Sequence, residues 1–336
     1  MTGRMEMDNK IETRCNKLLE DCPDYVSEWF ENLKANSMTS QTCFDYLNNI
    51  RKMILWYPEY PETIEQLSQK RTIEFFNASK KRYDEYEDEE IPVAISSQQA
   101  LWSALKNFFE YLCNMDYIKD NYMRTIKRPR TRDGEESDKE KVFLTQTDFN
   151  KLIKVIDRGA GTETAKKHQS HTRSRDKLIM LLFMTTGMRE SALCSINLND
   201  INIEKCQLTV IDKGNKHHYY SLTDDVMKAM NEWLVDRESK CNTCNALFIG
   251  NFDQRITPMG ITMIIKKFSK AALGRAISPH KLRAGFCSIL YSKTHDIEFV
   301  RRSVGHSQTQ TTQRYIVTDN KERKEASEII GNLLKF

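Results

Sequence analysis

The stretch KRPRTRDGEESDKEK, residues 127–141, constrains the fold most strongly, because it cannot take part in a hydrophobic core. It contains one proline, one glycine and blocks of charge of both signs, but no aliphatic or aromatic side chain. This composition is typical of a linker between domains. The chain has 336 residues, which is enough for two domains that each bury a core. We therefore expect one domain on each side of residues 127–141.

The part of the chain before the linker is expected to be helical. Residues 1–24 are predicted to form a polar N-terminal extension. From residue 25 onward, apolar residues recur at the spacing of a helix. The first such face consists of Tyr25, Trp29 and Leu33. The acidic run at 84–90 indicates a solvated loop, so residues 25–126 are predicted to form an all-helical domain.

Residues 142–336, after the linker, are expected to be mostly helical with a small antiparallel sheet. Thr145 and Asp148 have the spacing of a capping box, which predicts the start of a helix. Residues 158–175 are polar and indicate a long loop. In QLTVIDKGNKHHYYSL, residues 207–222, two β-rich runs flank the turn tripeptide KGN, which predicts a hairpin. The fold class is therefore mainly α.

Neither a membrane span nor a metal site is expected. No run of eighteen apolar residues exists, and the charged N-terminus lacks the apolar segment of a secretory signal. The nine cysteines are scattered and are interpreted as reduced cytosolic thiols. Cys241 and Cys244 form the only close pair, and zinc usually requires a second pair or two histidines. We expect a cytoplasmic protein without metal or other cofactor.

The charge is distributed unevenly along the chain. Residues 141–336 carry 31 Lys and Arg against 20 Asp and Glu, a net charge of +11, whereas residues 1–140 carry −7. A basic second half favours a polyanionic partner such as nucleic acid. The basic residues of the linker, namely Lys127, Arg128, Arg130 and Arg132, can follow a phosphate backbone or form part of a merely solvated linker.

Six residues in the second part form a possible constellation by their order. They are Arg189, Lys213, His280, Arg283, His306 and Tyr315. Each is ordinary alone, since an arginine at a helix end is usually a surface ion pair and a lysine in a hairpin turn is usually solvated. His280 and Arg283 lie three apart in a helix opened by Ser278 and Pro279, so they share a face.

This order resembles that of the tyrosine recombinase (phage integrase) family. TGMRESAL resembles the box around the family's first arginine, and IDKGNK its hairpin with the catalytic lysine. SPHKLRAGF and VGHSQTQTTQRYI resemble the second box and the terminal segment from histidine to tyrosine. YVSEWFENL resembles the family's core-binding domain more loosely. The resemblance implies a core-binding domain over 25–126 and a catalytic domain with a C-terminal tail over 142–336.

The expected chemistry explains these residue types. Guanidinium groups offer two parallel donors, so Arg189 and Arg283 suit the charge that develops on a phosphodiester under attack. Tyr315, on a polar segment, is the expected nucleophile and needs a base, for which His280 is suited. His306 is expected to donate to a phosphate oxygen. Lys213 is expected to protonate the leaving 5′-oxygen.

Two positions depart from the family's pattern. Ala192 stands where an acidic residue is usual, three after the first arginine, although Glu190 follows that arginine directly. Ala284 stands where histidine or tyrosine often follows the second arginine. Support for Arg189 and Arg283 must then come from other residues. Lys216, in the predicted hairpin, is a further candidate for DNA contact and an alternative acid.

The resemblance implies DNA cleavage and rejoining through a 3′-phosphotyrosyl intermediate, without metal or ATP. Integration or excision of a mobile element is the first interpretation, and Xer-like chromosome or plasmid dimer resolution is the alternative. A type IB topoisomerase typically has lysine at the position of His280, and an inactive DNA-binding protein would not keep all six residues. Expected partners are double-stranded DNA sites, further copies in a tetramer, and accessory factors for DNA bending or directionality.

Overall fold

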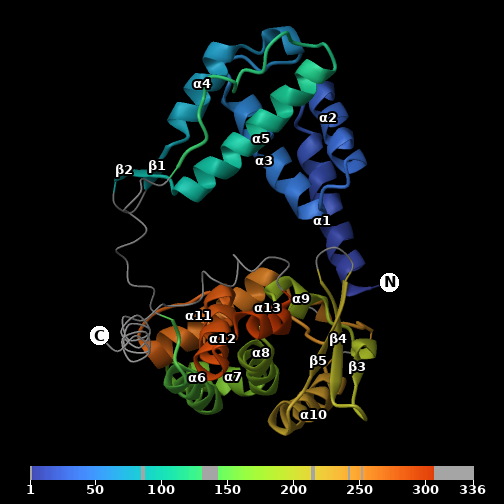
Figure 1. Cartoon of the computed structure of the whole chain (residues 1–336), viewed down its shortest axis with the longest axis vertical. Coiled ribbons are helices and arrows are strands. Elements are labelled where there is room, and N and C mark those ends of the chain that lie inside the picture. The colour runs from blue at the N-terminus through green and yellow to red at the C-terminus, as the bar shows by residue number, and fades with distance from the viewer. Residues whose placement is uncertain are drawn as a thin grey trace, which may run out of the picture. The chain divides into compact units, whose positions relative to one another are not determined.

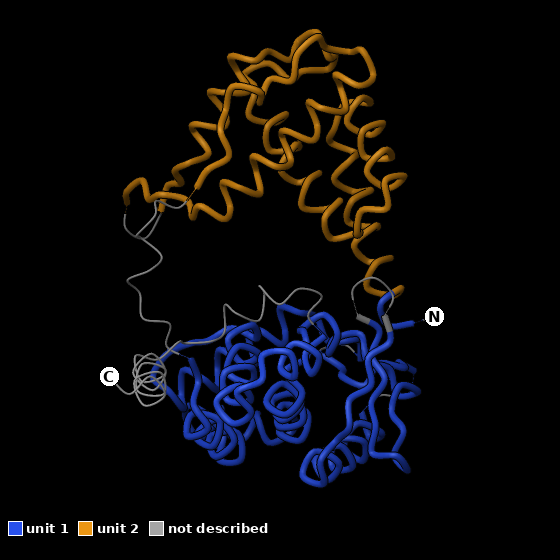
Figure 2. The backbone as a smooth tube through the Cα atoms, viewed as in Figure 1, with its two compact units in different colours: residues 1–4, 141–336 blue, residues 5–140 orange. Residues whose placement is uncertain are grey.

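A computed structural model describes residues 2–84, 88–130, 143–212, 216–240, 243–250 and 253–305 (Figure 1). The chain divides into two compact units (Figure 2). The N-terminal unit consists of residues 5–140, and the C-terminal unit consists of residues 141–336 together with residues 1–4. Each unit has its own core and is described by itself.

The N-terminal unit is built from helices around an aromatic core. Its helices are α1 (Gly3–Leu19), α2 (Asp24–Ala35), α3 (Ser40–Trp56), α4 (Gln69–Ala78) and α5 (Ile95–Asn114), with the short 3-10 helix η1 (Ile64–Gln66). Trp29 of α2 meets the edge of Phe108 of α5 with ring centroids 5.2 Å apart, and Phe108 meets Phe109 at the same separation. The periodic apolar residues of the sequence therefore form this core, and the helical prediction is confirmed.

The prediction of a purely helical first domain is wrong at one place. Strands β1 (Lys81–Asp84) and β2 (Glu89–Pro92) form an antiparallel hairpin around the acidic run. Most of its residues are exposed, and Lys81 Nζ lies 2.9 Å from Glu90 Oε2 across the pair. Because neither face is buried, the hairpin has no alternation of apolar and polar residues by which the sequence could reveal it.

The C-terminal unit is mostly helical, with one small antiparallel sheet at its edge (Figure 1). Its helices are α6 (Gln146–Arg158), α7 (Glu163–Ser170), α8 (Arg173–Thr186), α9 (Glu190–Ser195), η2 (Leu198–Asp200), α10 (Asp224–Glu238), α11 (Pro258–Leu273), α12 (Pro279–Thr294) and α13 (Ile297–Val304). Its strands β3 (Ile201–Asn202), β4 (Gln207–Asp212) and β5 (Lys216–Ser221) pair in the order β3-β4-β5. The predicted fold class and the predicted hairpin are confirmed.

Local sequence signals set the ends of several helices in this unit. The Thr145 hydroxyl accepts from the Asp148 N–H, and the Asp148 carboxylate accepts from the Thr145 N–H, so the predicted capping box begins α6. Residues 158–175 were expected to be a loop, but they contain α7. Thr162 caps α7, whose residues are exposed or half-buried, so the apolar periodicity that indicates a helix is missing there.

Helix α8 lies at the centre of the C-terminal unit and positions the site. It packs against α6, α10, α11 and α12. Leu178, Ile179, Leu182 and Phe183 are fully buried. Its C-terminus is Gly187, whose φ of 59° is a left-handed conformation that favours glycine. Gly187 therefore fixes where α8 ends and where the next segment of the chain begins. This segment carries Arg189.

Within the described residues, no helix has both the length and the apolar composition needed to span a bilayer.

Candidate active site

The end of α8 is in close contact with the middle of α12 at Gly187. A Cβ atom at Gly187 would lie 2.4 Å from the ring of Phe286 in α12, so only glycine allows this approach. Arg189, two residues later, is half-buried and is the N-cap residue of α9. The sequence motif around the first arginine thus forms a left-handed turn between two helices.

Arg283 is the residue that ties this part of the unit together. Its side chain is buried, with only 3% of the residue exposed. Nη1 donates to the Gly187 carbonyl oxygen at 2.6 Å, and Nη2 donates to the Val304 carbonyl oxygen at 2.8 Å. A guanidinium is a planar fork of five donors, so these two bonds fix its plane. Arg283 therefore joins α12 to the C-terminal ends of α8 and α13.

Glu190, the residue after Arg189, is hydrogen-bonded to α11. The Glu190 carboxylate accepts a hydrogen bond of 2.7 Å from the Thr262 hydroxyl. Burial raises the pKa of the Glu190 carboxyl, and this hydrogen bond lowers it. Ala192, where an acidic residue was expected from the family's pattern, is buried with 4% exposed. Support for the Arg189 segment therefore includes a contact to α11 that no sequence signal indicated.

The second departure, at Ala284, lies in a core cluster between α12 and α13. Ala284 is 3% exposed and packs with Cys287, Val300 and Val304. Burial raises the pKa of the Cys287 thiol to about 11, against the opposite effect of the nearby Arg283 charge. A thiol with such a pKa is a poor nucleophile at neutral pH. The position after Arg283 thus serves packing.

His280 lies in the first turn of α12, three residues before Arg283. Ser278 is the N-cap residue and Pro279 occupies the first turn, as predicted. The residue is exposed, but adjacent protein atoms remove part of the hydration of its ring. This desolvation, followed by the charges of Arg283 and Lys281, lowers the pKa of His280 from its ordinary value of 6.5. The ring is therefore neutral at pH 7 and can accept a proton.

The structure brings Arg189, His280 and Arg283 into one region at the junction of α8, α9 and α12. Lys213, His306 and Tyr315 lie outside the described residues. Lys216 begins β5, and only its backbone is described. Arg132 is also outside the described residues, whereas Lys127, Arg128 and Arg130 are exposed in the N-terminal unit.

Several structural residues of this region could not be identified from the sequence. The Val304 carbonyl and Thr262 carry no sequence signal, because a backbone acceptor and a helix hydroxyl are common everywhere. Gly187 has one, since a glycine that follows an apolar helix indicates a left-handed C-terminal cap. In the described part of the chain, no group of three or more His, Cys, Asp or Glu residues could hold a metal ion.

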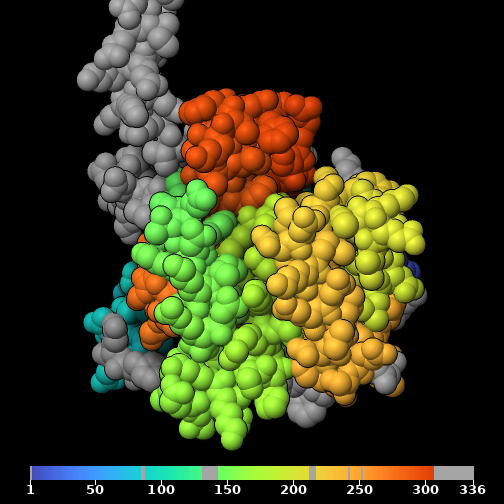
Figure 3. Space-filling model, turned by 90° about the horizontal axis from the view of Figure 1, so that it is seen from below, coloured from blue at the N-terminus to red at the C-terminus, as the bar shows by residue number. Residues whose placement is uncertain are grey.

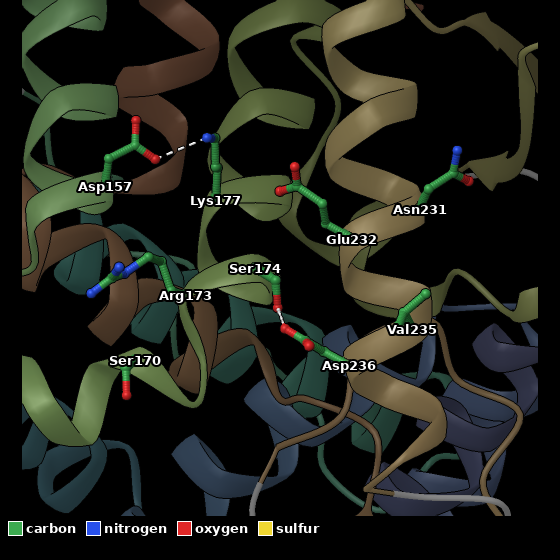
Figure 4. A pocket seen from close by; sticks show the side chains of 9 residues that line it. All are labelled: Asp157, Ser170, Arg173, Ser174, Lys177, Asn231, Glu232, Val235 and Asp236. Atoms are coloured by element: carbon green, nitrogen blue, oxygen red, sulfur yellow. Dashed lines mark hydrogen bonds and ion pairs between the residues drawn. The ribbon is translucent and has the colours of Figure 1, made fainter.

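A hollow of about 700 Å³, lined mostly by charged and polar residues, lies at the opposite end of α8 (Figure 4). It opens on the face seen in Figure 3, between α10 and helices α6 and α7. Lys177 pairs with Asp157 at 2.8 Å, and Ser174 donates to Asp236 at 2.5 Å. Thirteen residues of helix separate Arg173, in this hollow, from the end of α8, which corresponds to about 20 Å. The hollow is therefore distinct from the region of Arg189 and Arg283.

Comparison with known proteins gives a match over most of the C-terminal unit. Residues 142–322 match the model of the phage integrase family. A tyrosine recombinase XerC of Corynebacterium glutamicum is 32% identical over 179 residues, which are 53% of this chain and 58% of that protein. The matched region thus spans less than two thirds of that relative's length.

Two solved structures share the fold over most of the chain. XerH site-specific recombinase in a post-cleavage complex with palindromic difH substrate has a TM-score of 0.65 at 19% identity, with 96% of this chain and 89% of that chain covered. A lambda integrase tetramer bound to a Holliday junction has a TM-score of 0.59 at 15% identity, with coverages of 88% and 76%. At these identities, the similarity establishes the fold.

Proposed function

The chain belongs to the phage integrase family of tyrosine site-specific recombinases, and from this membership we propose that it cleaves and rejoins DNA through a 3′-phosphotyrosyl intermediate. The observation that carries the proposal is the buried guanidinium of Arg283, oriented by two backbone carbonyls. A buried, oriented cation that binds the chain two residues before a second arginine suits a substrate whose charge grows in the transition state.

Arg189 and Arg283 are proposed to bind the non-bridging oxygens of the scissile phosphate. The two carbonyl acceptors hold the plane of Arg283 before any DNA binds, so little reorganisation is needed during the reaction. A guanidinium can direct two parallel N–H groups at one phosphate, which an ammonium cannot do. The arginines therefore supply charge stabilisation without a metal ion.

Proton transfer is proposed to involve His280 and two residues outside the described part. Tyr315 attacks phosphorus as the phenolate, so its proton must be taken up by a base, and His280 has a pKa below 6.5 that keeps it neutral at pH 7. Lys213 protonates the leaving 5′-oxygen, and His306 donates a hydrogen bond to a phosphate oxygen. The phosphotyrosyl ester retains the energy of the broken bond, so rejoining needs no ATP.

Two biological reactions fit this chemistry. Integration or excision of a mobile element is the first, and Xer-like dimer resolution is the second, favoured by the relative named XerC. These two reactions can be distinguished by shearing and sequencing the DNA that is covalently attached to the protein in its host. Attachment at ends that flank the gene supports the first reaction, and attachment at one distant chromosomal site supports the second.

Self-association on DNA is proposed by analogy with the lambda integrase tetramer on a Holliday junction. The tail EASEIIGNLLKF ends in clustered apolar residues, and it lies outside the described residues. We propose that it docks on a neighbouring copy, with capping of its own domain as the alternative. Deletion of residues 328–336 should leave binding of a single copy to DNA intact and abolish cooperative assembly. A deletion variant that does not fold supports the alternative.

The proposed activity is tested with a nicked suicide substrate that releases a short fragment after cleavage. We expect a covalent protein–DNA species that resists denaturant and forms equally well in EDTA. The DNA should carry the recombination site identified by the shearing experiment above. No covalent species on that site, or cleavage that EDTA abolishes and magnesium restores, would contradict the proposed chemistry.

A further inference from the structure

Strand β5 has one face turned inward and one turned to solvent. His217 and Tyr219 are exposed, whereas His218 is half-buried and Tyr220 is 9% exposed. His218 is the register partner of Val210 in β4, and Val210 is 3% exposed. The ring of His218 stacks with that of Tyr220, with the planes of the two rings inclined by 29°. A histidine thus occupies the inward face of the strand, where an apolar residue is usual.

The ring of His218 lies against Gly305, the residue that ends α13. Gly305 has a φ of 67°, a left-handed conformation. A Cβ atom at this position would lie 2.6 Å from Cε1 and 2.7 Å from Nε2 of His218. Such distances are far below van der Waals contact, so the ring packs directly on the glycine backbone. Two independent constraints, the left-handed backbone and the ring, therefore require glycine here.

This contact continues directly to Arg283. Val304 precedes Gly305, is fully buried, and its carbonyl oxygen accepts the 2.8 Å hydrogen bond from Arg283 Nη2. The direction of that carbonyl depends on the backbone turn between Val304 and Gly305. The ring of His218 in β5 packs against the same turn. The position of this ring therefore limits how far the Val304 carbonyl can move.

We propose that His218 is a positioning residue for Arg283. It holds the turn at Val304 and Gly305 against β5, and the Val304 carbonyl then fixes the plane of the guanidinium that binds the scissile phosphate. The phosphate-binding role of Arg283 is part of the proposed function, and this inference rests on it. The contact between His218 and Gly305 does not depend on that role and is tested separately.

The contact is tested by a double-mutant cycle on thermal unfolding. Gly305→Ala introduces both strain at positive φ and a collision with the ring, whereas in the His218→Ala background only the strain remains. We expect the loss of Tm caused by Gly305→Ala to be smaller in that background by at least roughly 2–4 °C. Equal losses in both backgrounds would show that the two residues do not meet, and would overturn the proposal.

The positioning role is tested with two suicide substrates that share one sequence. One has a normal scissile phosphodiester, and the other has a methylphosphonate, which lacks one charged oxygen and so depends less on an arginine. Arg283→Ala serves as the reference. His218→Ala should cleave the phosphodiester about tenfold slower than wild type, with a markedly smaller loss on the methylphosphonate. His218→Phe, which keeps a ring, should restore most of the rate on the phosphodiester.

His217→Ala is the matched control, because His217 is the adjacent residue on the exposed face of β5. It should cleave both substrates like wild type. The positioning role would be overturned if His218→Ala lowered the cleavage rate equally on both substrates, or did not lower it at all. Failure of His218→Phe to restore the cleavage rate would also overturn it. If wild-type protein cleaves neither substrate, the proposed function fails instead, and the cycle on Tm still decides whether the contact exists.

Discussion

The two units of this chain bury different kinds of side chain. Among the described residues, Thr72 is the one buried polar side chain of the N-terminal unit. The C-terminal unit buries a larger set, which consists of Asp176, Thr186, Ser195, Asn197, Arg237, Arg255, Ser269 and Arg283. Burial of a charge is unfavourable unless hydrogen bonds compensate it. The C-terminal unit therefore depends on specific polar contacts, and the N-terminal unit depends on shape.

Among the described residues of the C-terminal unit, the three buried arginines all donate to backbone carbonyls. Arg283 binds the ends of α8 and α13, as described above. Arg255 donates to the carbonyl oxygens of Cys194, in the last turn of α9, and of Ile196, its C-cap residue. Arg237 donates to the carbonyl oxygens of Ala246 and Cys244. These guanidinium groups donate to acceptors at helix ends and in loops, outside the regular hydrogen bonding of helix interiors.

The difference indicates how each unit is suited to its role. Burial of aromatic surface favours compactness and is not directional. A hydrogen-bonded guanidinium has defined directions, so it can fix the ends of helices that carry reactive groups. Substitutions in the two units should therefore have separable effects, with loss of stability in one and loss of chemistry in the other.

The largest expected effect is on stability in the N-terminal unit. Phe108→Ala removes a fully buried ring between Trp29 and Phe109, and should lower the free energy of unfolding of this unit by about 3–5 kcal/mol. Denaturant unfolding followed by tryptophan fluorescence measures it. Tyr83→Ala, at a residue that is 59% exposed, is the control and should change little. A loss below about 1 kcal/mol for Phe108→Ala would show that the aromatic core does not stabilise this unit as proposed.

The next effect is on chemistry in the C-terminal unit. Arg283→Lys keeps the charge but loses the planar fork, so single-turnover cleavage should slow by about 100-fold or more, as for loss of one oriented donor. Retained binding to the DNA site and an unfolding transition above the assay temperature are the controls, because lysine cannot replace both hydrogen bonds to the backbone carbonyls and some loss of Tm is expected. Lysine that supports a near-normal rate would mean that charge alone, without fixed geometry, is sufficient.

A similar loss is expected from Lys213→Ala, by a different step. Removal of a general acid typically slows a reaction by about 100-fold or more. A substrate with a 5′-bridging sulfur, which leaves without a proton, should restore cleavage by Lys213→Ala but not by Arg283→Lys. The pair of variants thus separates leaving-group protonation from phosphate binding. Absence of rescue would assign the acid role to another residue, with Lys216 first in line.

The smallest expected effect is the pH dependence from His280. Its pKa is lowered from 6.5, so the neutral form is present at pH 7 and is lost only as the pH falls through the lowered value. The contribution of His280 to the free energy of unfolding is likewise fully present above pH 6.5. It decreases at lower pH, because the unfolded state then binds more protons than the folded state. The cleavage rate should fall on an acid limb with a midpoint below 6.5, absent in His280→Asn. A midpoint above 6.5 would contradict the assignment.

The sequence predicted those parts of the fold that have local or periodic signals. The helices of the N-terminal core, the capping box at Thr145 and the hairpin at 207–222 all have such signals, and each is present. The hairpin β1–β2 and the polar helix α7 were missed, because exposed elements need no apolar pattern. Local physical chemistry thus predicts elements that bury an apolar face, and it misses exposed elements even where a capping residue is present, as Thr162 is in α7.

The candidate site was predictable by residue type but not by its supports. Arg283 was identified from the order of residues that resembles the tyrosine recombinase family, yet its two acceptors come from positions 96 and 21 residues away in the sequence. The bond between Glu190 and Thr262 spans 72 residues. Contacts of this length depend on tertiary packing, which a single sequence does not reveal. The same applies to His218 and Gly305.

The central claim is that Tyr315 is the nucleophile, and the most direct measurement is mass spectrometry of the trapped complex. After nuclease and protease digestion, we expect a residual nucleotide on the peptide that contains Tyr315. Tyr315→Phe removes one oxygen, so it should fold and bind DNA normally but form no covalent species. A nucleotide on Tyr219, Tyr291 or another residue, or an adduct that persists in Tyr315→Phe, would show that Tyr315 is not the nucleophile.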